Sequence, residues 1–214
     1  MKDNTGHLFL EGSQYFYWLI GLNIMFLVFN LPLLLALTFL QLIPANSLYF
    51  YLSLLPFGIS LQAMFSCFGK VKKEKDINVF KDYYYYYKKD MKKSFAVWTI
   101  LSLVIYIVIL NVNFLMGASF FALIFPTYIV LIIIFMSALI CSLFIVSTNK
   151  EIRIMEIFKH SFYISIKKIY VVIFNIILFS MWLFVIFLRP VLGLGVMPSV
   201  ISFMMAKNNE LIFS

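Results

Sequence analysis

Six long runs of apolar residues, separated by polar or charged connections, dominate the pattern of this sequence. A helix needs about 20 apolar residues to cross roughly 30 Å of hydrocarbon, and five of the runs reach that length. The sixth is shorter and carries Gly193, Gly195 and Pro198, so we expect its helix to begin near Pro198, after a bent segment packed against protein. The six runs are Tyr15–Leu40, Leu48–Phe68, Phe95–Met116, Phe120–Val146, Ile169–Leu188 and Val191–Ala206. The pattern predicts an all-α fold, a polytopic transmembrane helical bundle of about six spans.

The composition agrees with a membrane protein. The chain is 64% hydrophobic and 12% charged, whereas roughly 25% of the residues of a soluble domain are charged. Almost all of the 214 residues are needed for spans and their connections. We therefore expect residues 1–214 to form a single integral membrane domain in the lipid bilayer.

Basic residues indicate how the bundle is oriented. Nine lysines lie between the second and third runs, and five basic residues lie between the fourth and fifth, while the opposite side has only Arg189. By the positive-inside rule, both basic connections and both termini are predicted to be cytoplasmic. The richness in Lys, Ile, Phe, Asn and Tyr is typical of an AT-rich bacterial genome, so the predicted location is a bacterial plasma membrane. The net charge of +8 is explained by this placement, and nucleic acid is not an expected partner.

Each basic connection contains a stripe of apolar residues at helical spacing. These stripes predict amphipathic cytoplasmic helices over Ile77–Met91 and Met155–Ile169, with their stripes packed inward. Shifted by 78 residues, the two segments also resemble each other, with Lys81 matching Lys159 and Lys89 matching Lys167. One interpretation is an internal repeat of two spans plus a cytoplasmic helix, related by an axis along the membrane normal. The other is convergent composition at the membrane interface. The stripes are Ile77, Phe80, Tyr84, Tyr87, Met91 and Met155, Phe158, Phe162, Ser165, Ile169.

Five consecutive tyrosines, Tyr83–Tyr87, lie in the first of these helices. They fit an aromatic belt at the inner interface, with Tyr84 and Tyr87 on the buried stripe. Alternatively, the tyrosines that project outward form a docking surface for a cytoplasmic partner, since exposed tyrosine is enriched in interfaces. On that hypothesis the partner-binding residues are Lys81, Tyr83, Tyr86, Lys88 and Lys159.

Residues that carry chemistry are scarce. All nine acidic residues lie outside the apolar runs, the two histidines are far apart in the sequence, and no glycine-rich phosphate loop is present. Cys67 and Cys141 are expected to be free, packed thiols. The sequence therefore predicts no catalytic residues, no metal site and no cofactor, and the protein is not expected to be an enzyme.

A few polar residues lie within the apolar runs. Asn23 and Asn30 are seven residues apart and share a helix face, and Gln62 lies in the second run. Hydrogen bonds between helices are one role for such residues. The other is to line a substrate cavity, in which case Asn23, Asn30 and Gln62 are the candidate substrate-binding residues. Pro32, Pro56 and Pro126 interrupt spans and are expected to produce kinks or to free backbone carbonyls.

Three short motifs resemble those of the YesL family, small bacterial membrane proteins of unknown function. They are Leu22-Asn23 followed by Leu31-Pro32, the aromatic and basic segment from Phe80-Lys81 to Met91-Lys92, and the ending Gly195–Ser199. The resemblance extends over nearly the whole chain. Members of that family are often encoded beside carbohydrate uptake systems of the ATP-binding cassette (ABC) type, so the resemblance implies a role near sugar import.

The expected function is thus that of a non-enzymatic accessory to a carbohydrate ABC-type transporter, contacting its permease or ATPase subunit. The alternative is a substrate-capturing membrane subunit like the small components of energy-coupling vitamin transporters. A membrane enzyme acting on lipid or glycan is the third reading, and the missing catalytic constellation disfavours it.

Overall fold

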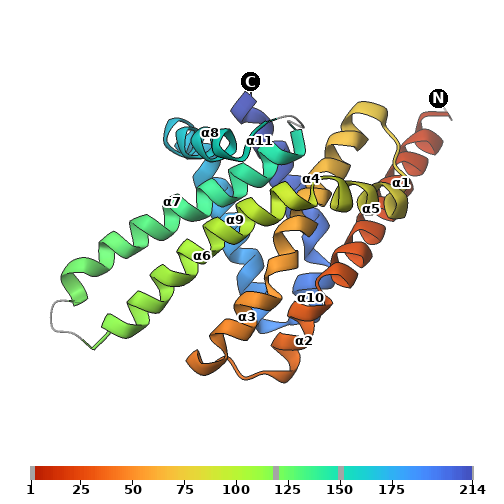
Figure 1. Ribbon diagram of the computed structural model, residues 1–214. Coiled ribbons are helices and arrows are strands. Elements are labelled where there is room, and N and C mark those ends of the chain that lie inside the picture. Colours follow the sequence, from red (N-terminus) through yellow and green to blue (C-terminus); the bar gives the residue numbers. More distant parts are fainter. Residues whose placement is uncertain (1–2, 118–120, 149–151, 214) are drawn as a thin grey trace.

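The chain folds into a bundle of helices joined by short breaks (Figure 1). The computed structural model describes residues 3–117, 121–148 and 152–213, and this part of the chain contains no strand. The predicted all-α membrane bundle is confirmed. In chain order the elements are α1 (Asp3–Phe29), α2 (Leu31–Phe39), a 3-10 turn (Pro44–Asn46), α3 (Ser47–Ser53), α4 (Leu55–Glu74), α5 (Val79–Lys89), α6 (Met91–Leu115), α7 (Phe121–Thr148), α8 (Ile154–Lys167), α9 (Ile169–Leu188), α10 (Pro190–Gly195) and α11 (Met197–Phe213).

Fewer helices are long and apolar enough to cross a membrane than the sequence suggested. Among the described residues there are four: Pro44–Glu74, Met91–Leu115, Phe121–Thr148 and Ile169–Leu188. The first predicted run is bent by 66° between Gln14–Phe29 and Leu31–Phe39, and counting this pair as one span gives five. The bend follows from Pro32 in the first turn of α2, where a fixed φ and a missing N–H are tolerated only at a helix start.

The sixth predicted run divides into α10 and α11. α10 ends at Gly195, Val196 forms the break, and α11 begins at Met197. Gly193 and Leu194 of α10 are buried, so the prediction of a late helix after a bent, packed segment is confirmed. α11 has 17 residues and carries Lys207 and Glu210 in its second half, which is why the expected sixth span is not among the long apolar helices.

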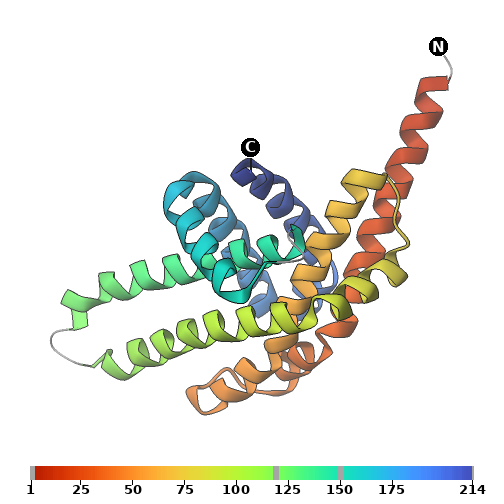
Figure 2. The same ribbon diagram turned by 45° about the horizontal axis from the view of Figure 1, so that its top comes forward.

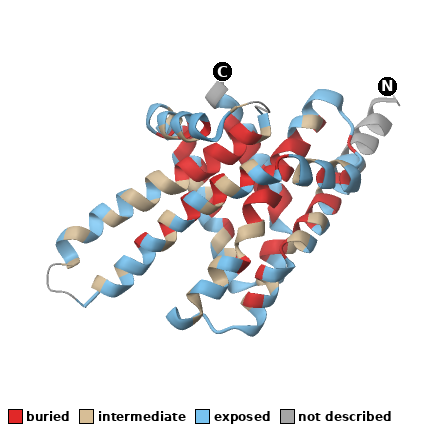
Figure 3. Cartoon of the chain, in the orientation of Figure 1, coloured by how far each residue is buried: buried red, intermediate tan, exposed pale blue. Residues whose placement is uncertain are grey.

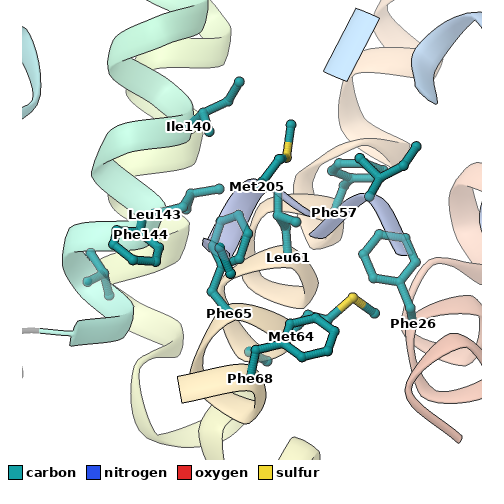
Figure 4. Packing of buried hydrophobic residues seen from close by; sticks show 14 of the residues in the cluster. Phe26, Phe57, Leu61, Met64, Phe65, Phe68, Ile140, Leu143, Phe144 and Met205 are labelled. Carbon is teal, nitrogen blue, oxygen red and sulfur yellow. The ribbon is translucent and has the colours of Figure 1, made fainter. Parts of the chain in front are cut away.

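The core is built around α4. Every residue from Phe57 to Phe68 is buried, and the red core in Figure 3 is centred on this helix. Aromatic rings surround it: the Phe26 ring lies 5.2 Å from Phe57, and Phe65 lies 5.8 Å from Phe144 of α7. Figure 4 shows Met205 of α11 reaching into the same cluster. α4 therefore contacts helices from every part of the chain.

Three helical hairpins pack around one another in a ring. The hairpins are α1 with α4, α6 with α7, and α9 with α11. The first helix of each hairpin also packs against the second helix of another, α6 on α4, α9 on α7 and α1 on α11. The outer halves of α6 and α7 extend away from the other helices (Figures 1 and 2) and are largely exposed. Such a cyclic order of hairpins is expected if the hairpins are repeats of one unit, related by rotation about an axis along the bundle.

The ends of α5 and α8 follow the proposed repeat, although α8 begins three residues earlier than the shift of 78 predicts. α5 ends at Lys89 and α8 ends at Lys167, and each is followed by a one-residue break, Asp90 and Lys168. Both breaks are thus related by the same shift of 78 residues that aligns the sequences. On each helix the buried face lies at matching positions, with Val79 matching Ile157. The two amphipathic segments are confirmed as helices, and their matching ends and buried positions agree with the repeat interpretation.

Replacing Gly58 by alanine should destabilise the bundle. A Cβ atom at Gly58 would lie 2.2 Å from the Trp98 ring, and Trp98 is held because its indole N–H donates to the Leu54 carbonyl at 3.1 Å. Overpacking of this kind costs about 1–3 kcal/mol. We expect Gly58→Ala to lower the Tm of the detergent-solubilised protein. Gly69→Ala is the matched control in the same helix, since a Cβ there meets nothing within 4 Å; an equal loss of Tm in both variants would contradict the packing explanation.

Candidate functional site

α5 is fixed at its start by local hydrogen bonds. Asn78 precedes the helix, and its side-chain oxygen accepts from the Lys81 N–H at 3.3 Å. The Asp82 carboxylate accepts from the Asn78 N–H at 2.9 Å. These are the capping contacts that satisfy the free amides of a first turn, and the last turn carries Lys88 and Lys89, which suit the negative end of the helix dipole.

Two contacts attach α5 to α4. The Lys70 ammonium lies 2.8 Å from both oxygens of Asp82, with both side chains partly shielded from solvent. The Tyr83 hydroxyl donates to the Ser60 carbonyl at 3.1 Å. α5 is also held to α1, where Val79 lies against Gly21 and the Phe29 ring lies 4.1 Å from Tyr87. α5 is therefore a firmly packed helix and not a loose loop.

The tyrosine run is phased differently from the prediction. Tyr83 is fully buried, so its assignment as a partner-binding residue is wrong: a partner cannot reach it without unfolding α5. Tyr84, which was expected on the inward stripe, is exposed together with Phe80 and Met91. Burial raises the pKa of Tyr83 well above its usual value, so the phenol stays neutral. Five identical residues give no periodicity of their own, and the buried face is set by Gly21 and Ser60 instead.

α8 packs against α7 by a face of mostly small residues. Its buried positions are Ile157, Ser161 and Ser165, and the Phe162 ring contacts Phe135 of α7 at 5.7 Å. Of the predicted inward stripe, Ser165 is buried and Phe158 and Phe162 are half-buried, but Met155 and Ile169 are exposed. That part of the prediction is wrong because the buried face is centred on Ile157 and Ser161, beside the predicted stripe.

The predicted lysines do face outward. Lys81 and Lys88 of α5 and Lys159 of α8 are exposed, and Tyr86 is half-buried. Lys81 and Lys159 occupy matching positions in the repeat. The structure thus leaves four of the five proposed partner-binding residues at least partly accessible, on two helices of common design.

Asn23 has a structural role. Its side-chain oxygen accepts from the Ser199 N–H at 2.8 Å, and its amide donates to the Val196 carbonyl at 2.9 Å. These two bonds bridge the break between α10 and α11. A third bond supports the same turn, since the Trp182 indole N–H donates to the Gly193 carbonyl at 2.7 Å. Because both polar atoms of Asn23 are engaged, this residue is not available to bind a substrate in this conformation.

Asn30 and Gln62 differ from Asn23, because each keeps one oxygen without a hydrogen-bond partner. Asn30 lies in the break between α1 and α2, and its amide donates to the Phe26 carbonyl in the last turn of α1 at 2.8 Å. The Gln62 amide donates to the Ser66 hydroxyl at 2.9 Å and lies 3.4 Å from the Asp90 carboxylate. Both side chains are fully buried. A buried acceptor without a partner lowers the stability of the folded protein by about 1–3 kcal/mol. Each of these two oxygens could therefore accept a hydrogen bond from a bound molecule.

The three predicted substrate residues do not border the apolar pocket between α1, α4 and α11. That pocket is lined by Tyr15, Trp18, Leu19, Phe68, Val71 and Phe203. Cys67 and Cys141 are buried free thiols, as expected. Across residues 3–117, 121–148 and 152–213, no group of three or more His, Cys, Asp or Glu side chains is placed to hold a metal.

Three polar contacts join α9 and α4 to the second half of α11, and the sequence analysis did not identify their partners. Asn175 of α9 donates to Asn209 of α11, and Asn208 donates to Asn175 at 2.9 Å. Lys72 of α4 forms an ion pair with Glu210 at 2.8 Å. The signal was present in the run Lys207–Glu210, which is polar although it continues an apolar segment.

Comparison with known proteins finds one family model that matches part of the chain, and it describes no activity. Residues 19–112, from α1 to near the end of α6, match the family model described as a protein of unknown function, DUF624. No curated protein and no solved structure matches the chain. The matched part includes α4 and α5, and so contains the core helix and one of the two amphipathic helices.

Replacing Asn23 by leucine should destabilise the protein. The substitution leaves the Ser199 N–H and the Val196 carbonyl without partners, which we expect to cost roughly 1–3 kcal/mol, measured as a lower Tm in detergent. Asn111→Leu is the control, since Asn111 is exposed and donates only to the Ile107 carbonyl of its own helix. If Asn23→Leu keeps the wild-type Tm, the bridging role assigned to Asn23 is wrong.

Proposed function

We propose that this protein is a non-enzymatic accessory subunit of a carbohydrate transporter of the ABC type in a bacterial plasma membrane. The single observation that carries the proposal is the pair of amphipathic helices, α5 and α8, with exposed lysines at matching positions. The resemblance to the YesL family supplies the class of transporter. The proposal includes no catalytic step and no cofactor.

The proposed docking surface consists of Lys81, Tyr86, Lys88 and Lys159. Lys81 and Lys88 are seven residues apart and share one face of α5, away from Val79 and Tyr83, which pack on the bundle. An acidic surface on a permease or ATPase subunit would complement these charges. Because such exposed charges tune encounter and specificity more than folding, the surface can be altered without loss of the bundle.

Substrate capture within the bundle is the second candidate. The observation that favours it is the pair of buried oxygens without partners on Asn30 and Gln62. The contacts of Asn23 count against it, since this residue is committed to the α10–α11 break. The accessory role is therefore the better supported proposal.

The proposed orientation places α5, α8 and both chain ends in the cytoplasm. Single cysteines introduced at Lys73 and Lys207, both exposed, should resist a membrane-impermeant thiol reagent in intact cells, whereas a cysteine at Ala45 should react. All three should react after the membrane is permeabilised. The native Cys67 and Cys141 are buried and serve as the unlabelled background. Labelling of the cysteine at position 73 in intact cells would show that the proposed orientation is wrong.

Charge reversal at Lys81, Lys88 and Lys159 should weaken the association with a transporter subunit. We expect the triple glutamate variant to insert normally and keep a near wild-type Tm, while losing most of the permease or ATPase that co-purifies from native membranes and is identified by mass spectrometry. A variant that reverses the exposed Lys73 and Lys207 is the control and should retain the partner.

Two results would reject the accessory role. One is that the triple variant retains each transporter subunit at the wild-type level. The other is that no transporter subunit co-purifies even with the wild-type protein after cross-linking. Retention of a small sugar by the purified wild-type protein, lost on replacement of Gln62 by leucine, would favour substrate capture instead.

A further inference from the structure

A lysine stacked on a tyrosine occurs twice, at matching positions of α5 and α8. The Lys89 ammonium lies 5.2 Å from the centre of the Tyr85 ring and donates to the Tyr85 hydroxyl at 3.2 Å. The Lys167 ammonium lies 5.3 Å from the centre of the Tyr163 ring. Both tyrosines are more than half exposed, Tyr85 at 52% and Tyr163 at 57%. We call these the two lysine–tyrosine pairs.

The pairs recur although neighbouring surface positions differ. Lys88 lies over Tyr84 in α5, but the matching residues of α8 are Ile166 and Phe162. Asp82, which binds Lys70, is matched by His160. The two helices have therefore diverged around the pairs, so shared helix packing alone does not explain why both pairs are present.

Exposed apolar side chains indicate the depth of both helices in the membrane. Phe80 and Tyr84 of α5 are about half exposed, and Met155 and Ile166 of α8 are exposed by 80% and 76%. Such side chains are stable where they enter the acyl boundary, and an interfacial helix buries its apolar face by about 5–10 Å. Since a helix with its side chains is roughly 10 Å across, the remaining faces of α5 and α8 lie among the lipid headgroups.

The chemistry of each pair suits a phosphate group. The lysine brings a compact positive charge with three N–H donors. The Tyr85 oxygen accepts one of these from Lys89, which leaves the phenol hydrogen to donate outward. The hydrogen bond from Lys167 to the Tyr163 hydroxyl raises the pKa of Lys167, so this lysine stays charged. Each pair therefore offers a cation and a hydroxyl donor side by side at headgroup depth.

We propose that the two lysine–tyrosine pairs, Tyr85 with Lys89 and Tyr163 with Lys167, are two equivalent binding sites for the phosphate of an anionic phospholipid. The charges are complementary, and the depth of the helices selects a lipid headgroup over a soluble anion. The lysines proposed to contact a transporter subunit are different ones, so the two functions are separable by mutation.

The test is lipid retention by the purified full-length protein in a neutral detergent. The micelles are titrated with dioleoyl-phosphatidylglycerol or, separately, with dioleoyl-phosphatidylcholine, and native mass spectrometry counts the bound lipids. We expect the wild-type protein to retain two phosphatidylglycerol molecules in preference to phosphatidylcholine. Lys89→Gln should retain one and Lys89→Gln/Lys167→Gln none, and Tyr85→Phe/Tyr163→Phe should bind about tenfold more weakly because a charge-assisted hydrogen bond is lost.

The matched control is Lys81→Gln/Lys159→Gln, which removes the same charge from the same two helices at matching positions and should keep both lipids. If this control loses as many bound phosphatidylglycerol molecules as Lys89→Gln/Lys167→Gln does, the lipids are held by diffuse attraction to a basic surface and the proposal is overturned. The proposal is also overturned if the wild-type protein retains phosphatidylglycerol and phosphatidylcholine equally. Displacement of phosphatidylglycerol by millimolar inorganic phosphate would overturn it as well. If the double glutamine variant proves unstable, the tyrosine-to-phenylalanine variant, which keeps charge and ring, decides the question.

Discussion

The close packing of α4 against its neighbours is the constraint on which the rest of the structure depends. In a bilayer, helices gain little from the hydrophobic effect when they associate, because lipid is as apolar as the side chains. Close contact of small residues must supply the attraction instead. α4 provides them at Gly58, Ser60, Ala63 and Ser66, all fully or nearly fully buried, and Gly58 lets the Trp98 ring lie directly on the helix backbone.

Elements that appear peripheral are positioned through that helix. α5 is attached to it by Tyr83 and by the Lys70–Asp82 ion pair. α11 is attached at the opposite side, by the contact of Phe203 with Phe68 and by the ion pair of Glu210 with Lys72. A soluble or membrane partner that binds α5 would therefore act on a rigid support, which suits a docking surface better than a mobile lid.

The sequence was sufficient for the features that depend on long stretches of residues. The lengths of the apolar runs predicted the long apolar helices α4, α6, α7 and α9. The spacing of apolar residues predicted the helices α5 and α8. Pro198 with Gly193 and Gly195 correctly indicated the late start of α11. The phase of the tyrosine run was not predictable, since Tyr83 is buried only because Ser60 and Gly21 lie opposite it, and such contacts are not visible in the local sequence.

The in-span polar residues show the same limit. Asn23 and Asn30 share a helix face and are both buried, as their spacing predicted. Their roles nevertheless differ, because Asn23 meets the free backbone groups at the α10–α11 break while Asn30, in the α1–α2 break, bonds back to the last turn of α1. The partner of Asn23 lies 176 residues away, so only the folded chain distinguishes a structural asparagine from a binding one.

Several exposed residues of α5 and α8 match when the sequence is shifted by 78 residues. Two helices that share a buried face and a helix break have kept Lys81 with Lys159 and the two lysine–tyrosine pairs, while Lys88 and Ile166 differ. Buried positions match because both helices pack on hairpins of one design. Packing does not require the surface positions to match, and the two proposals above assign the shared lysines and tyrosines to a common ligand or partner chemistry.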